Sequence, residues 1–166
     1  MKRSVLLFGA LFALFAAASP AIASDRSEAL SAVGKFIQAG NGDSREAYAA
    51  YCAADAVIVD HVAPYVFRGP GACLDHWDAV GAFVAQNSMV VGSYAQLGAP
   101  AMVDIKGERA YVVAPWTAAV TMSGKPKVEK GVATFVLRRD ADRVWRFTNV
   151  TWASFGFSPA ALHFST

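Results

Sequence analysis

The sequence contains few charged residues, and it lacks the motifs of several large enzyme classes. Only 17% of its 166 residues are charged, whereas 55% are hydrophobic. This apolar, aromatic-rich composition excludes a disordered chain and a coiled coil, and the length is that of one domain. The sequence has no G-x-S-x-G nucleophile motif and no glycine-rich phosphate loop. Its composition therefore indicates a globular domain outside these common hydrolase and nucleotide-binding classes.

The first residues of the chain predict export. Met1–Arg3 is basic, Val5–Ala18 is an apolar run, and Ala21–Ala23 has the A-x-A pattern of a cleavage site. The apolar run is shorter than the roughly 20 residues that span a bilayer, so we expect no membrane span after the signal is removed. We predict a signal peptide over residues 1–23, a single domain over residues 24–166, and a periplasmic or secreted location. A signal retained as an anchor is the alternative.

Net charge and cysteine are also scarce. Lys2 and Arg3 belong to the predicted signal, so 13 basic residues remain against 13 acidic ones. A neutral chain lacks the basic surface that nucleic-acid binding needs, and we expect no such partner. Cys52 and Cys73 are the only cysteines, and no C-x-x-C pair suggests zinc. In an oxidising compartment they form either a disulfide or two buried free thiols, and both alternatives stay open.

Hydrophobic spacing predicts helices first and strands later in the chain. Leu30, Val33, Phe36 and Ile37 share one helical face. The other expected elements are a short helix near residues 44–51, a helix over 73–86, short extended pieces at 56–61 and 64–68, and strands over 89–105 (bent at 98–100), 109–122, 128–139 and 143–155. This segregation predicts an α+β fold with an antiparallel sheet. The strands are apolar on both faces in places, so we expect one face to form a homodimer contact.

This order of elements resembles a known superfamily. Three helices, with a short hairpin between the second and third, precede a long four-stranded meander, and the segments Ala53–Asp60, Phe67–Gly71 and Arg143–Phe147 carry the likeness. The chain resembles the nuclear transport factor 2-like superfamily, in its ketosteroid isomerase and SnoaL-like branch, over residues 27–156. The resemblance implies a cone-like, strongly curved antiparallel sheet of about four long strands plus a short hairpin. It also implies that three helices close one side of the sheet around a mostly apolar pocket.

Asp60 is the main candidate for catalysis. It ends the apolar run Val57–Val59, where burial is expected to raise the pKa of its carboxyl group and allow it to take a proton from carbon. By resemblance, Asp60 falls where ketosteroid isomerase keeps its general base. The alternative is that Asp60 only caps the end of the strand. The adjacent His61 is the second catalytic candidate, as a proton shuttle, and His76 was considered for the same role.

The resemblance fails at the groups that stabilise negative charge. The tyrosine donor of ketosteroid isomerase falls on Phe36, and its aspartic-acid donor falls near Thr134. Because these donors supply much of the stabilisation of the intermediate, steroid isomerisation by that mechanism is not expected. Thr134, Tyr65 or a tryptophan indole are candidate substitute donors.

The aromatic residues predict an apolar ligand. The expected ligand-contacting residues are Phe36, Tyr65, Trp77, Trp116, Thr134 and Trp152. The alternative is that the aromatic side chains only fill the core. The pairs Asp60-His61 and Asp75-His76 do not predict a metal site, because neighbouring side chains diverge on a strand or a helix, and no cofactor is expected. Two functions remain: binding of a small apolar molecule, with or without acid–base chemistry at Asp60, or a non-catalytic ligand-binding or protein-interaction module.

Overall fold

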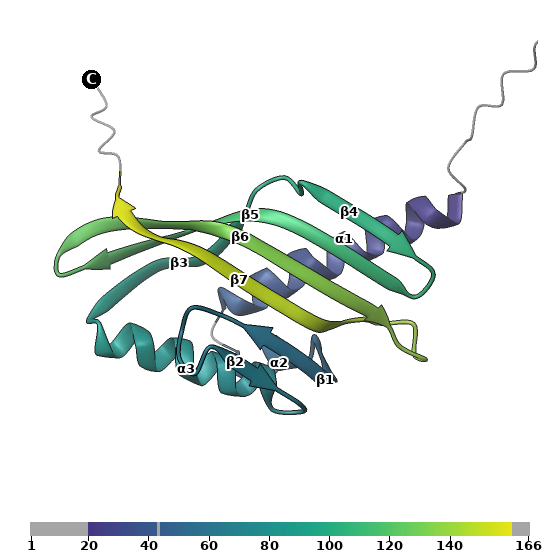
Figure 1. Ribbon diagram of the computed structural model, residues 1–166, viewed down its shortest axis with the longest axis horizontal. Coiled ribbons are helices and arrows are strands. Elements are labelled where there is room, and N and C mark those ends of the chain that lie inside the picture. Colours follow the sequence, from purple (N-terminus) through teal and green to yellow (C-terminus); the bar gives the residue numbers. More distant parts are fainter. Residues whose placement is uncertain (1–19, 43, 161–166) are drawn as a thin grey trace, which may run out of the picture.

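The α+β class predicted from the sequence is confirmed by a computed structural model that describes residues 20–42 and 44–160 (Figure 1). The helices of this part are α1 (Pro20–Gly40), α2 (Arg45–Ala49) and α3 (Ala72–Gln86). Its strands are β1 (Cys52–Val59), β2 (Val66–Arg68), β3 (Met89–Leu97), β4 (Met102–Lys106), β5 (Arg109–Met122), β6 (Lys125–Arg139) and β7 (Trp145–Pro159). Residues 1–19 of the predicted signal lie outside the described residues. No helix in the described ranges combines the length and apolarity needed to cross a membrane.

The seven strands form one sheet. Their order is β2-β1-β7-β6-β5-β3, and β4 pairs with β5 beside β3. β5, β6 and β7 are joined by antiparallel hairpins, as the turn residues between them predicted. The segment expected to be extended over residues 89–105 is two strands that both pair with β5, and they separate around Gly98–Pro100, where the bend was expected. Figure 1 shows β5, β6 and β7 as the long strands at the centre of this sheet.

One pairing corrects the predicted topology. β1 runs parallel to β7, so the sheet is mixed, and the prediction of a purely antiparallel sheet is wrong. Turn signals reveal pairings between strands that follow each other in the chain, whereas β1 and β7 are about 90 residues apart. A parallel pair needs a long crossover connection, and here the whole of β2 to β6 provides it.

The helices and one face of the sheet share a single core. Alternate residues of β6 point into it, and Phe135 and Leu137 are fully buried there. Phe36 of α1 stacks against Tyr48 of α2, with ring centroids 4.6 Å apart, and packs on Phe147 of β7 at 4.4 Å. The periodic apolar residues of the first helix therefore bury the face that the sequence predicted.

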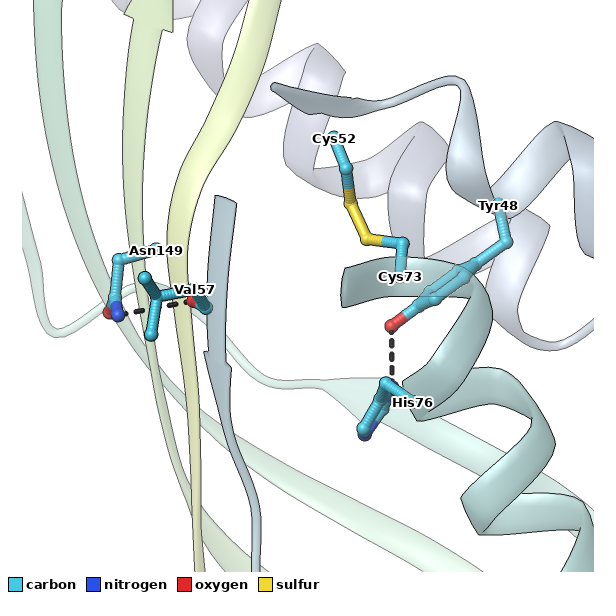
Figure 2. The surroundings of a disulfide bond; sticks show 6 residues. All are labelled: Tyr48, Cys52, Val57, Cys73, His76 and Asn149. Carbon is cyan, nitrogen blue, oxygen red and sulfur yellow. Dashed lines mark hydrogen bonds between the residues drawn. A yellow bond between two sulfur atoms is a disulfide. The ribbon is translucent and has the colours of Figure 1, made fainter. Parts of the chain in front are cut away.

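A disulfide ties β1 to α3 (Figure 2). Cys52 begins β1 and Cys73 lies in the first turn of α3, and the two sulfur atoms are bonded. Of the two alternatives left open by the sequence, the disulfide is the one found. The loop that it closes contains β1, β2 and Asp60. The bond therefore limits the separation of two elements that carry the site described next.

Candidate functional site

An apolar cavity of about 170 Å³ lies between the helices and the inner face of the sheet. Its walls come mainly from α1, α3 and strands β3, β5 and β7, and include Phe36, Trp77, Phe83, Trp116, Val120 and Trp152. A cavity of about 150 Å³ holds a benzene-sized molecule. The space therefore suits one ring or a short acyl chain.

Asp60 is the centre of a polar cluster in this cavity. Its Oδ2 lies 2.8 Å from Nε2 of His76, and its Oδ1 lies 2.8 Å from Nδ1 of His61. The backbone N–H of Val62 donates to Oδ1 over 3.0 Å. Because β1 ends at Val59, the chain turns directly after Asp60, and His61 folds back onto its neighbour instead of pointing to the opposite face.

Tyr48 of α2 supports the His76 arm of this cluster. The Tyr48 hydroxyl lies 3.0 Å from Nδ1 of His76, as Figure 2 shows. Burial raises the pKa of Tyr48, so its hydroxyl stays protonated and donates. With the ring proton of His76 on Nε2, Nδ1 accepts from Tyr48 while Nε2 donates to Asp60, and this assignment satisfies all three buried groups.

Glu129 of β6 faces the other arm. Its side chain is buried, Oε1 lies 3.2 Å from Nε2 of His61, and Oε1 also accepts a hydrogen bond from the Ser154 hydroxyl. Burial raises the pKa of Glu129 above its ordinary value. Sequence reasoning missed Glu129 and Tyr48. The alternation of β6 carried a signal for Glu129, since residue 129 lies on the same face as Ala133 and Phe135.

The pKa of Asp60 moves in the direction opposite to that expected from the sequence. Burial alone would raise it, but the contacts with His61 and His76 outweigh burial and hold the pKa well below its usual range. The contact with Asp60 in turn raises the pKa of His61, against the opposing effect of burial. Asp60 is therefore a permanent anion that orients two imidazoles, and a weak base.

The structure separates the predicted site residues into two groups. Those that line the cavity are Asp60, His61, Phe36, Trp77, Trp116 and Trp152. Tyr65 and Thr134 are not among the residues that line this cavity. Tyr65 is 59% exposed in the turn between β1 and β2, with φ at 74°. Thr134 is on the face of β6 opposite Ala133 and Phe135, and therefore points away from the core.

Two tryptophans form part of the cavity wall. Trp116 and Trp152 meet edge to face, with ring centroids 5.5 Å apart. Both indole nitrogens are enclosed and have no hydrogen-bond partner within residues 20–42 and 44–160. Trp116 lies against Gly131, where an added Cβ would be 2.6 Å from the indole nitrogen. The indoles therefore contribute mainly apolar surface to the wall as it stands.

The architecture defines the class of protein: the chain has the nuclear transport factor 2-like fold, as the sequence resemblance indicated. No protein-family model and no curated protein sequence matches the chain. Solved structures do match it. One is a hexachlorocyclohexane dehydrochlorinase, LinA-type3, from Novosphingobium barchaimii LL02, with a TM-score of 0.68 and 15% identity over 87% of this chain and 97% of that one.

Two further solved structures have the same fold. A ketosteroid isomerase-like protein from Erwinia carotovora atroseptica SCRI1043 matches with a TM-score of 0.64 and 17% identity, over 80% of this chain and 97% of that one. A nuclear transport factor 2-like protein from Novosphingobium aromaticivorans matches with a TM-score of 0.63 and 16% identity, over 81% and 84% respectively. At these identities, the likeness establishes the fold alone.

Proposed function

We propose that the protein is an enzyme that moves a proton on a small, mostly apolar molecule bound in the cavity. The observation that carries this proposal is the position of the Tyr48–His76–Asp60–His61–Glu129 cluster in the wall of an otherwise apolar space. Buried, mutually oriented titratable groups at a ligand-sized cavity are the features of an acid–base site. The volume favours a substrate with one ring over a steroid.

The chemistry that this cluster can perform is removal of a proton from carbon. Apolar walls strengthen each interaction inside the cavity, and the Asp60 carboxylate holds both imidazoles in fixed orientations. Loss of the proton leads to isomerisation when it returns at another carbon, or to elimination when a neighbouring group leaves. Two solved structures with this fold, a dehydrochlorinase and a ketosteroid isomerase-like protein, support these two reaction classes.

Three further features belong to this proposal. The basic start, apolar run and A-x-A pattern of residues 1–23 favour export to the periplasm or the medium. The breaks in strand register between Glu129 and Gly131, between Val136 and Leu137 and near Ser93 favour the strong curvature that a conical pocket needs. Exposed apolar side chains, including Val144 and Phe155, favour a homodimer, which light scattering on the purified protein would test.

The proposal is tested by ligand binding to the purified protein, followed by turnover. The panel contains single-ring ketones, halogenated cyclohexanes, lactones and short fatty acids, with steroids as oversized controls. A ligand at about 100 times its Kd adds roughly 2.7 kcal/mol to the free energy of unfolding, which a melting curve resolves. We expect single-ring compounds to stabilise the protein, and product analysis to show proton transfer that Asp60→Asn reduces. Binding without turnover would instead indicate the non-catalytic ligand-binding module, and no binding would indicate an interaction module.

A further inference from the structure

We infer that Glu129, and not Asp60, is the catalytic base that takes the proton from the substrate, with Asp60 as a positioning residue. This inference rests on the proposed function of the cavity. A catalytic base in this cluster needs a lone pair that faces the cavity and is not already used by a neighbouring group.

The oxygen atoms of Asp60 are occupied. Oδ2 accepts from His76 at 2.8 Å, and Oδ1 accepts from the Val62 N–H at 3.0 Å and lies 2.8 Å from His61. His76 uses both of its ring nitrogens, one toward Asp60 and one toward Tyr48. A substrate proton could reach Asp60 or His76 only if one of these buried contacts were broken, and breaking it would leave a polar group unpaired.

His61, which is partly exposed, and the buried Glu129 form the other arm of the cluster. The two nitrogens of His61 face carboxylates, at 2.8 Å from Asp60 and 3.2 Å from Oε1 of Glu129. Oε1 of Glu129 also holds the Ser154 hydroxyl. Oε2 of Glu129 makes no hydrogen bond to any residue of the described ranges. Packing does not enclose this oxygen completely, and Glu129 is one of the residues that line the cavity.

The backbone around Glu129 directs its side chain into the cavity. The β6–β7 register shifts between Glu129 and Gly131, and a Cβ at Gly131 would lie 2.0 Å from the carbonyl oxygen of Ala153. Only glycine permits this close approach of the two strands. Ser154 of β7 then fixes one carboxyl oxygen and leaves the other free. Burial also raises the pKa of Glu129 toward the working range of a general base, whereas Asp60 is shifted the other way.

The proposed proton transfer involves only the substrate and side chains of this protein. The C–H bond of the substrate breaks, its proton forms a bond to Oε2 of Glu129, and the electron pair moves into an adjacent electron-withdrawing group or expels a leaving group. The proton then either returns to a different carbon of the substrate or, after the carboxyl group of Glu129 rotates, passes to the lone pair of Nε2 of His61, which lies 3.2 Å from the Oε1 position. His61 is partly exposed, so it connects the cluster with solvent.

The test uses two defined probes. Toluene reports occupancy of the cavity, and 5-nitrobenzisoxazole reports a base: removal of its C3 proton breaks the ring N–O bond, forms a nitrile and releases a coloured nitrophenolate. We expect the protein to open this ring faster than acetate at equal concentration. The rate should rise with pH through one ionisation. Glu129→Gln should lower kcat/KM at least about 100-fold, the smallest usual contribution of a general base. Toluene affinity should stay within twofold.

Three further variants show whether a lower ring-opening rate in Glu129→Gln reflects loss of the base. Glu46→Gln, at an exposed glutamate of α2, is the matched control and should change nothing. Glu129→Asp keeps the carboxylate but withdraws it by one methylene, and it should retain an intermediate rate. Asp60→Asn should shift the midpoint of the pH profile, with a smaller loss of kcat than Glu129→Gln.

The outcomes separate this inference from the proposed function. Toluene binding with no acceleration of ring opening overturns the catalytic role of Glu129. So does a wild-type rate in Glu129→Gln, or a rate abolished by Asp60→Asn or His61→Gln alone. Absence of toluene binding to the wild-type protein overturns the proposed function of the cavity itself, and the inference with it.

Discussion

The inner face of β6 behaves differently at its two ends. Near its carboxyl end, Phe135 and Leu137 are fully buried and pack against the aromatic rings of α1 and β7. Near its amino end, Glu129 lines the cavity, and the strand register shifts between Glu129 and Gly131. The strand alternation is the same in both halves. Side-chain volume and polarity, together with this register shift, therefore distinguish the half that is solid core from the half that lines the site.

The largest expected effect on stability comes from removing a buried aromatic ring from the core end of β6. Phe135→Ala should lower the free energy of unfolding by about 3–5 kcal/mol, because the ring is fully buried and its removal leaves a void. Urea unfolding measures the loss. Val136→Ala, on the opposite face of the same strand, should cost far less. Equal losses for the two variants would contradict the assignment of the core face.

The disulfide stabilises the connection between β1 and α3, two elements that hold residues of the site. Replacing both Cys52 and Cys73 by Ala should lower the free energy of unfolding by about 3 kcal/mol, because the bond closes a loop with a sequence separation of 21. Urea unfolding of the wild type in reductant should give the same value as the double variant. A wild type that is insensitive to reductant would show that the bond does not form in solution.

A methyl group at Gly131 should destabilise the end of β6 that lies near the cavity. Gly131→Ala should cost about 1–3 kcal/mol of unfolding free energy, because its Cβ would collide with the carbonyl of Ala153 and with Trp116. The matched control is Gly34→Ala in α1, where an added Cβ meets nothing within 4 Å and should stabilise the protein by about 0.5–1 kcal/mol. Thermal unfolding of both variants should show shifts of opposite sign.

The two buried carboxyl groups should give opposite slopes of stability against pH. The lowered pKa of Asp60 means that the unfolded chain binds the proton first, so stability should fall as the pH drops below about 4, by up to about 1.4 kcal/mol per pH unit. The raised pKa of Glu129 means that the folded protein holds its proton longer, so stability should fall as the pH rises above about 4.5. Urea unfolding across this pH range should show that Asp60→Asn makes the first slope shallower, because Asp55, Asp140 and Asp142 also have lowered pKa values, and that Glu129→Gln removes the second.

The sequence predicted what depends on local pattern. The helical spacing of Val33 and Phe36 located the core face of α1, and the apolar run at residues 109–122 matches β5. The apolar run before Asp60 and the Asp-His pair that it forms with His61 indicated these two residues, and both line the cavity. These inferences needed only the neighbours of each residue along the chain.

The remaining features depend on residues that are distant in sequence. The β1–β7 pairing joins strands about 90 residues apart in the chain, and Tyr48 meets His76 across 28 residues. The pKa of Asp60 was expected in the wrong direction because burial was considered without the two histidines that fold onto it. Thr134 could have been excluded from the sequence, since Phe135 beside it was a clear core residue and adjacent strand residues point to opposite faces.

The parallel pairing of β1 with β7 also has a consequence for the order of folding. β7 lies between β1 and β6 in the sheet, although both of those strands precede it in the chain. Asp60 follows β1 and Glu129 belongs to β6, so the strand synthesised last is the one that aligns the two carboxylates. Such long-range contacts form slowly because a large loop must close before they can. A chain in which residues 52–139 are already made therefore has no complete polar cluster until residues 145–159 insert between β1 and β6.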